Sequence, residues 1–139
     1  MTTSTATLVA RKSARVASRS SVVSAVESRD LQGGGPPPHI HHREDETFQI
    51  LEGEYEFTVA GKTLRAKQGD TLFAPRGIPH TYRYRGKTPG RLMTVITPAG
   101  FERFFEEIGS MSPQQQQDIP RVIEIGKRYG LEILPPPDA

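Results

Sequence analysis

The chain has 139 residues, enough for one domain with a buried core and too few for two domains of ordinary size. Charged residues make up 24% of the sequence and the formal net charge is only +2, so the composition does not require nucleic acid or an anionic membrane surface as a partner. There is no cysteine, which excludes disulfides and thiolate ligands and leaves histidine and carboxylate as the metal-binding side chains.

No stretch of the sequence resembles a membrane helix or a secretory signal. A membrane helix needs roughly 18 consecutive apolar residues, and the N-terminus lacks the apolar core of a signal peptide. We therefore expect a soluble, cytoplasmic protein.

Basic residues and small hydroxyl residues dominate the N-terminal segment, residues 1–32. No acid occurs before Glu27, a composition that resembles an organelle transit peptide. The β-branched runs Thr7 to Val9 and Ser21 to Val26 favour another interpretation, in which two short edge strands are separated by solvated basic residues. We prefer the edge strands and keep the targeting peptide as the alternative.

Residues 33–97 have the pattern of an all-β domain. Three glycines and three prolines at Gly33 to Pro38 break regular structure, and short apolar runs then alternate with turn residues at the spacing of a barrel or sandwich. The expected strands are His39 to His42, Thr47 to Leu51, Glu54 to Val59, Thr63 to Ala66, Thr71 to Ala74, His80 to Tyr84 and Leu92 to Thr97. Glycines where a positive φ is expected favour a meander of antiparallel strands; they are Gly53, Gly61, Gly69, Gly86 and Gly90.

Residues 98–139 change to a helical period. Apolar side chains at i, i+3, i+4 and i+7 form one helix face that Gly109 can terminate; they are Phe101, Phe104, Phe105 and Ile108. We expect this helix to pack on the outside of the barrel. A lid over the barrel mouth is the alternative.

Two shorter helices and a tail are expected after it. A helix begins near Ser112, where Gln115 can complete a capping box, and another runs from about Asp118 to Tyr129. The segment Leu131 to Leu134 is expected to pack back on the barrel as an extended tail.

The strand expected at residue 39 carries two histidines with a shared direction. His39 and His41 project from the same face of a strand because side chains alternate. Glu46 has the wrong parity to join them on one continuous strand, so the polar run 42–45 must contain a turn or bulge. Glu46 then opens the next strand, with Phe48 and Ile50 on its own face.

A third histidine, His80, follows a Pro/Gly turn and begins a strand that carries Tyr82 on the same face. Three imidazoles and one carboxylate suit Fe, Mn, Ni, Co, Cu or Zn and do not suit Ca or Mg. The sequence therefore predicts one divalent transition metal ion, held by His39, His41, Glu46 and His80. The alternative is that the histidines are hydrogen-bonded core groups.

His42 points to the opposite face of the strand from His39 and His41, and it is expected at the surface or an interface.

These stretches resemble the two sequence motifs of the cupin superfamily. Gly33 to Gly53 resembles the first motif: Gly, five residues, HxH, three or four residues, Glu, six residues, Gly. Gly69 to His80 resembles the second, with Pro75 and Gly77 at the expected spacing and Tyr84 in place of the closing Asn. The resemblance covers about half of the chain and implies an all-β, single-domain jelly-roll barrel with short C-terminal helices. More narrowly, the run Pro36 to Glu46, the turn Leu51 to Glu54 and the helical tail look like those of single-domain cupins grouped with quercetin dioxygenase.

The resemblance implies a function for the metal. In the quercetin dioxygenase-like group, the carboxylate that matches Glu46 is both a ligand and the base that takes the substrate hydroxyl proton. This favours a metal-dependent dioxygenase that acts on an aromatic, flavonoid-like or polyketide-like enol. The alternatives are a non-redox isomerase, cyclase or lyase, and a non-catalytic small-molecule-binding cupin. The resemblance also implies a homodimer.

Several inward-facing side chains are candidates for substrate contact; they are Phe48, Ile50, Phe73, Tyr82 and Met93. Plain barrel core explains four of these positions equally well. Tyr82 is the exception, because its hydroxyl can reach a metal-bound ligand from the His80 strand, and we include it with Glu46 as a candidate catalytic residue.

Overall fold

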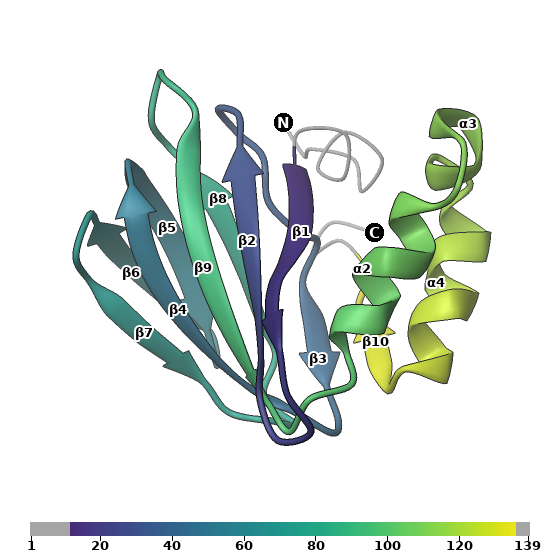
Figure 1. Cartoon of the computed structure of the whole chain (residues 1–139). Helices are drawn as coiled ribbons and strands as arrows, with labels where there is room; N and C mark the ends of the chain where they lie inside the picture. Colours follow the sequence, from purple (N-terminus) through teal and green to yellow (C-terminus); the bar gives the residue numbers. More distant parts are fainter. Residues whose placement is uncertain (1–11, 136–139) are drawn as a thin grey trace.

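Two antiparallel sheets face each other in the computed structural model, which describes residues 12–135 (Figure 1). The front sheet has the strand order β1-β2-β9-β4-β7 and the rear sheet the order β10-β3-β8-β5-β6. The helices lie together beside the sandwich, next to β1 and β10 (Figure 1). The predicted all-β jelly-roll class is confirmed, although the two sheets do not close into a continuous barrel.

The front sheet consists of β1 (Lys12–Arg19), β2 (Ser24–Asp30), β9 (Gly90–Thr97), β4 (Asp45–Glu52) and β7 (Thr71–Ala74). The rear sheet consists of β10 (Leu131–Ile133), β3 (His39–His41), β8 (His80–Tyr84), β5 (Glu54–Val59) and β6 (Lys62–Lys67). The helices are α2 (Glu102–Gly109), α3 (Pro113–Gln116) and α4 (Ile119–Arg128). None of the helices between residues 12 and 135 is both long and apolar enough to cross a membrane.

The strands of residues 33–97 occur where the sequence predicts them, but they are not connected as a meander. From β3 to β9 the chain changes sheets at every connection except the β5–β6 hairpin. The local turn residues were compatible with simple hairpins, but burying apolar faces from both sheets against each other requires the crossings. Because of these crossings, residues from β3, β4 and β8 can meet between the sheets.

Alternation along the strands decides which side chains reach the interior. On β4, Phe48 and Ile50 are 3% and 1% exposed, so their predicted inward direction is confirmed. The expectation that Phe73 and Met93 face inward is wrong. Phe73 pairs with Thr47 and is 56% exposed, and Met93 pairs with Gln49, so both have the parity of the outer face.

The N-terminal part of the front sheet differs from the sequence prediction. Of the two expected edge strands, Thr7 to Val9 lies outside the described residues, and the second is realised as β2, which lies between β1 and β9. The edge strand is β1, formed by residues that were interpreted as a solvated basic connection. Its charges are tolerated because Arg15 and Arg19 project to the surface and pair with Glu27 and Glu102.

The C-terminal elements follow the predicted signals closely. Ser112 and Gln115 form the capping box of α3, and the side chain of Asp118 caps α4. Gly130, with φ of 75°, ends α4 and turns the chain into β10. Strand β10 pairs with β3, so the predicted extended tail lies directly beside the two histidines of that strand.

Tyr84, the departure from the second cupin motif, is packed among three glycines. Its ring is buried, and its hydroxyl donates a hydrogen bond to the carbonyl of Thr88 at 2.5 Å. A Cβ atom on Gly53, Gly86 or Gly90 would lie 2.1–2.4 Å from an atom of this ring or its hydroxyl. Gly53 also has a positive φ, but Gly86 and Gly90 do not, so the expected reason for these two glycines is wrong. They provide space for the Tyr84 ring.

Candidate metal centre

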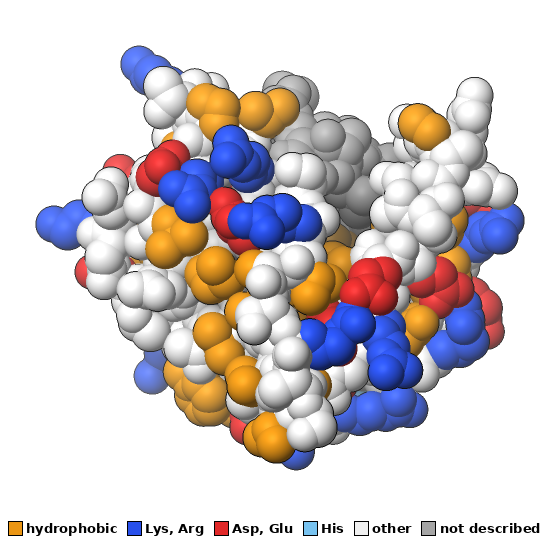
Figure 2. All heavy atoms as spheres, in the orientation of Figure 1, with side chains coloured by type: hydrophobic (Ala, Val, Ile, Leu, Met, Phe, Trp, Pro, Cys, Tyr) orange, Lys and Arg blue, Asp and Glu red, His pale blue; other side chains and the backbone are white. Residues whose placement is uncertain are grey.

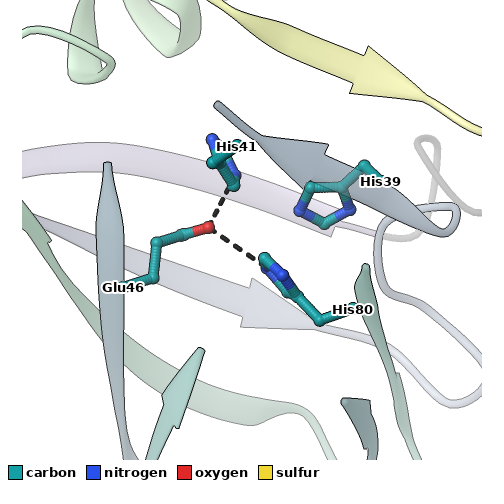
Figure 3. A group of neighbouring side chains, drawn as sticks. All are labelled: His39, His41, Glu46 and His80. Atoms are coloured by element: carbon teal, nitrogen blue, oxygen red, sulfur yellow. Dashed lines mark hydrogen bonds and ion pairs between the residues drawn. The ribbon is translucent and has the colours of Figure 1, made fainter. Parts of the chain in front are cut away.

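The four side chains predicted as ligands converge between the two sheets (Figure 3). His39 and His41 come from β3, His80 comes from β8 beside it, and Glu46 comes from β4 of the opposite sheet. One ligand atom from each of the four lies within 4.8 Å of the others, and all four residues are buried. Such a group of nitrogen and oxygen donors could hold a metal ion.

The turn after β3 gives Glu46 its position. Residues 42–44 carry the chain from the rear sheet to the front sheet, and β4 begins at Asp45. The predicted break in the polar run is therefore confirmed as a change of sheet, which aims Glu46 back toward His41. His42 points outward as expected, and its Nε2 atom lies 2.7 Å from a carboxylate oxygen of Glu132.

Backbone carbonyls orient two of the imidazoles. Nδ1 of His39 lies 2.8 Å from the carbonyl oxygen of Pro37, and Nδ1 of His80 lies 3.4 Å from that of Ile78. The hydroxyl of Thr81 holds the proline segment in place by donating to the carbonyl of Pro36 at 2.7 Å. These contacts leave the Nε2 atoms of both histidines facing the centre.

Glu46 is the charge at the middle of the group. Its Oε1 atom lies 2.5 Å from Nε2 of His41 and 3.2 Å from Nε2 of His80. Burial alone would raise the pKa of Glu46, but the His41 charge and the hydrogen bonds from both histidines hold that pKa well below its usual value. Glu46 is therefore a carboxylate at neutral pH, the form that binds a metal.

The two histidines of β3 have opposite shifts. Burial, reinforced by the neighbouring His80 and His41, holds the pKa of His39 well below its usual value, so this ring is neutral. Burial also lowers the pKa of His41, but Glu46 and Glu44 together outweigh it and the net pKa is raised. His41 therefore holds a proton more tightly than His39 does. A metal ion that binds His41 must displace that proton.

A cavity of about 350 Å³ opens from the centre toward the helices. His39, His41 and Glu46 line its inner end, and the side chains of Phe48 and Tyr82 line its wall. Ile50, Phe73 and Met93 do not line it, so three of the five residues considered for substrate contact lie elsewhere. Ile50 is part of the core behind the cavity.

Helix α2 packs beside the sandwich, as expected, and its inner face also forms one wall of the cavity. Its apolar face, together with side chains of α4 and β10, completes the lining; these residues are Phe101, Phe104, Phe105, Ile108, Ile119, Val122, Leu131 and Ile133. The ring of Phe101 meets the ring of His41 edge to face, with centroids 4.4 Å apart. The helical spacing identified this apolar face, but no local signal showed what it covers.

Tyr82 lies in the cavity wall, 3% exposed. Its hydroxyl is hydrogen-bonded to the side chain of Ser28, and burial with the nearby Asp30 and Tyr55 raises its pKa well above the usual value. Tyr82 is therefore neutral at neutral pH, and its hydroxyl can donate a hydrogen bond.

Sequence comparison places these residues in a known family. The cupin domain model matches residues 28–96, a segment that contains all four side chains of the centre. The chain is a small cupin. Nothing in the comparisons distinguishes the quercetin dioxygenase-like group within that family.

Curated relatives of this cupin come from plants and bacteria. Germin-like protein subfamily 2 member 2 of Arabidopsis thaliana is 39% identical over 69 residues, which are 46% of this chain and 32% of the relative. The tetracenomycin polyketide synthase protein TcmJ of Streptomyces glaucescens is 32% identical over 60 residues, 43% of this chain and 40% of the relative. The matches span half or less of the length of these curated relatives.

Solved structures support the fold. KdgF from a Halomonas species superimposes with a TM-score of 0.64 at 19% identity, covering 68% of this cupin and 84% of KdgF. At that identity the likeness establishes the jelly-roll fold alone.

Proposed function

We propose that this cupin is a metal-dependent enzyme that oxygenates a small aromatic or polyketide-like enol. The observation that carries the proposal is a buried set of three imidazoles and one carboxylate, of which His39, His41 and Glu46 line the inner end of a largely apolar cavity. His39, His41, Glu46 and His80 would hold one ion of Fe, Mn, Ni, Co, Cu or Zn. When bound, such an ion supplies Lewis acidity toward an enol oxygen and, for the redox-active metals, a route for electrons to dioxygen.

The cavity is suited to a small aromatic ligand. Its volume of about 350 Å³ lies within the range of roughly 300–1,000 Å³ that is usual for small-molecule sites. Phenylalanines of α2 and Phe48 of β4 offer apolar and ring surfaces, which bind planar carbon frameworks and exclude water. The hydroxyl of Tyr82 is a polar group in the same wall that can donate to a substrate oxygen.

Glu46 is proposed as the base. It is ionised, buried and adjacent to the position that a ligand in the inner end of the cavity would occupy. A carboxylate in this position can accept the proton of a substrate hydroxyl and so convert an enol to its anion. His41 and His80, which contact Oε1, keep that oxygen aimed at the centre.

The similarity to TcmJ, a protein of a polyketide synthase, supports a substrate of the polyketide type. The same site without redox chemistry would give an isomerase, cyclase or lyase, so the two must be separated by experiment. The purified protein is loaded with Fe, Mn, Ni, Cu or Zn and offered a panel of phenols and enols. Oxygen uptake in at least one redox-active form, abolished by His80→Ala, is expected.

Other results of this experiment would indicate a different function. Anaerobic turnover by the zinc form would indicate Lewis-acid chemistry, and tight binding without any product would indicate a binding module. Absence of both binding and turnover across the panel would contradict the proposal.

We also propose that the protein is a homodimer formed through the front sheet. Figure 2 shows apolar side chains on the outer face of this sheet, where Phe73 is 56% exposed and the outward-facing Met93 and Val95 are half-buried. Light scattering on the full chain should give twice the monomer mass, and Phe73→Asp should shift the protein to monomer. Leu64→Asp, at a similarly exposed position on β6, is the control.

A further inference from the structure

Each imidazole of the centre has one ring nitrogen turned away from the other ligands, here called its outer nitrogen. The three rings differ in the group that faces this nitrogen. In His39 and His80, Nδ1 faces a backbone carbonyl two residues earlier in the chain, that of Pro37 or Ile78. In His41 the outer nitrogen is also Nδ1, since Nε2 contacts the central carboxylate, and this Nδ1 is buried with no hydrogen-bond partner among residues 12–135. The main chain therefore orients two of the rings and leaves the third without such support.

Glu44 lies opposite this nitrogen. The residue is 5% exposed, and its Oε1 atom is also buried without a hydrogen-bond partner in the described part of the chain. Oε1 of Glu44 and Nδ1 of His41 are 3.9 Å apart, about 1 Å longer than an ordinary N–H···O hydrogen bond. Two unpaired polar atoms in the interior are unfavourable, and here a potential donor and a potential acceptor lie 3.9 Å apart.

The charges of Arg43 and Arg76 act on Glu44, but the hydrogen bonds of these arginines go to other groups. Arg76 donates through its backbone and its guanidinium to the carboxylate of Asp45. The guanidinium of Arg43 donates to the carbonyl of Arg128 at 3.2 Å and packs against Gly130. The hydrogen bonds of both arginines are thus directed to other groups, and the Glu44 carboxylate faces His41.

We propose that Glu44 is a positioning residue of the metal centre and accepts a hydrogen bond from Nδ1–H of His41. The inference rests on the metal binding that is part of the proposed function. A neutral imidazole that binds a metal through Nε2 must carry its proton on Nδ1, and that N–H needs an acceptor. A rotation of either side chain closes the gap to Oε1 of Glu44, which fixes the ring in this tautomer and orientation.

Metal affinity tests the role of Glu44. Zinc(II) is titrated into the full-length protein in competition with a chromophoric chelator, for the wild type and for Glu44→Ala, Glu44→Gln and Asp45→Asn. Glu44→Ala should weaken binding by about 10- to 100-fold, as loss of an outer partner of a ligating histidine typically does. Glu44→Gln should lose less, because its amide oxygen can still accept the bond. Asp45→Asn, which removes one charge from the adjacent residue, should bind like the wild type.

The tautomer of His41 gives a readout that a purely structural role would not change. Long-range ¹H–¹⁵N correlation spectra of the wild-type zinc form should show His41 protonated at Nδ1, with its Nδ1–H proton hydrogen-bonded. In Glu44→Ala that signal should shift or exchange rapidly, while the signals of His39 and His80 stay in place. This measurement needs only the wild type if the alanine variant fails to fold.

Defined results overturn the inference. Wild-type affinity together with an unchanged His41 signal in Glu44→Ala would contradict the role of Glu44 and leave the metal centre intact. An equal loss of affinity in Asp45→Asn would also contradict it. Absence of zinc binding to the wild type would overturn both this inference and the proposed function.

Discussion

Oε1 of Glu46 lies 2.5 Å from Nε2 of His41, and both side chains are buried. The carboxylate belongs to the front sheet and the imidazole to the rear sheet, so this contact joins the two layers of the sandwich. The same oxygen contacts His80 on a second rear strand. A metal ion at this junction would connect three strands from two sheets, and its binding free energy would stabilise the folded state directly.

Zinc(II) should therefore raise the thermal midpoint of the wild type. At 100 times the dissociation constant, a ligand that binds only the folded state contributes about 2.7 kcal/mol, or roughly 10 °C for a domain of this size. Glu46→Gln should abolish the shift, whereas Glu54→Gln, an exposed carboxylate, should keep it. Differential scanning calorimetry with zinc and with chelator measures both. An equal shift in Glu46→Gln would show that zinc binds elsewhere.

The pH dependence of stability should be linked to Glu102, which anchors α2 to the front sheet. Burial would raise its pKa, but the hydrogen bond from the Gly100 N–H and the charge of Arg19 are among the interactions that outweigh burial and lower it. A folded pKa below the unfolded value means that the stabilisation is complete above the unfolded pKa of about 4.5 and is lost as the pH falls through the folded pKa.

Glu102→Gln should accordingly be less stable than the wild type at pH 7, and the difference should shrink as the pH falls below about 4.5. Thermal midpoints measured between pH 7 and pH 3 in metal-free buffer test this. The control is Glu124→Gln, an exposed carboxylate on α4, which should follow the wild-type profile. A constant difference between Glu102→Gln and the wild type over the whole range would contradict the linkage.

The packing of Tyr84 predicts unequal effects of glycine substitution. An alanine Cβ at Gly90 would lie 2.2 Å from a ring carbon of Tyr84, so Gly90→Ala should destabilise by about 1–3 kcal/mol through overpacking. Gly109 has no atom within 4 Å of the added Cβ and no positive φ, so Gly109→Ala should be neutral or slightly stabilising. Urea unfolding of the two variants measures the contrast, and equal effects would contradict it.

The sequence was sufficient to predict the parts of the centre that depend on local rules. Strand alternation predicts that His39 and His41 share a face, and the parity of Glu46 predicts the turn before it. Both follow from backbone geometry within a few residues. The capping signals at Ser112 and Asp118 succeeded for the same reason, because a cap is satisfied by neighbours in the chain.

Features that depend on contacts between distant segments were not predictable in this way. Phe73 and Met93 are apolar, but pairing with β4 puts them on the outer face. The basic residues of β1 look like a solvated connection until Glu27 and Glu102 are brought next to them. The apolar face of α2 was recognised, yet only the fold shows that it turns toward the metal centre.

The helical wall predicts that ligand binding and metal binding can be separated by mutation. Ile108 of α2 lines the cavity but is not among the residues of the centre, so Ile108→Trp should fill part of the cavity and leave the ligand atoms in place. We expect zinc affinity like that of the wild type and at least about a 10-fold loss of affinity for phenols or enols, which corresponds to about 1.4 kcal/mol of binding free energy. Leu64→Trp, on the exposed face of β6, is the control for adding a large ring. Isothermal titration with zinc and then with the ligand measures both affinities. Unchanged ligand affinity in Ile108→Trp would show that the ligand does not occupy the part of the cavity beside Ile108.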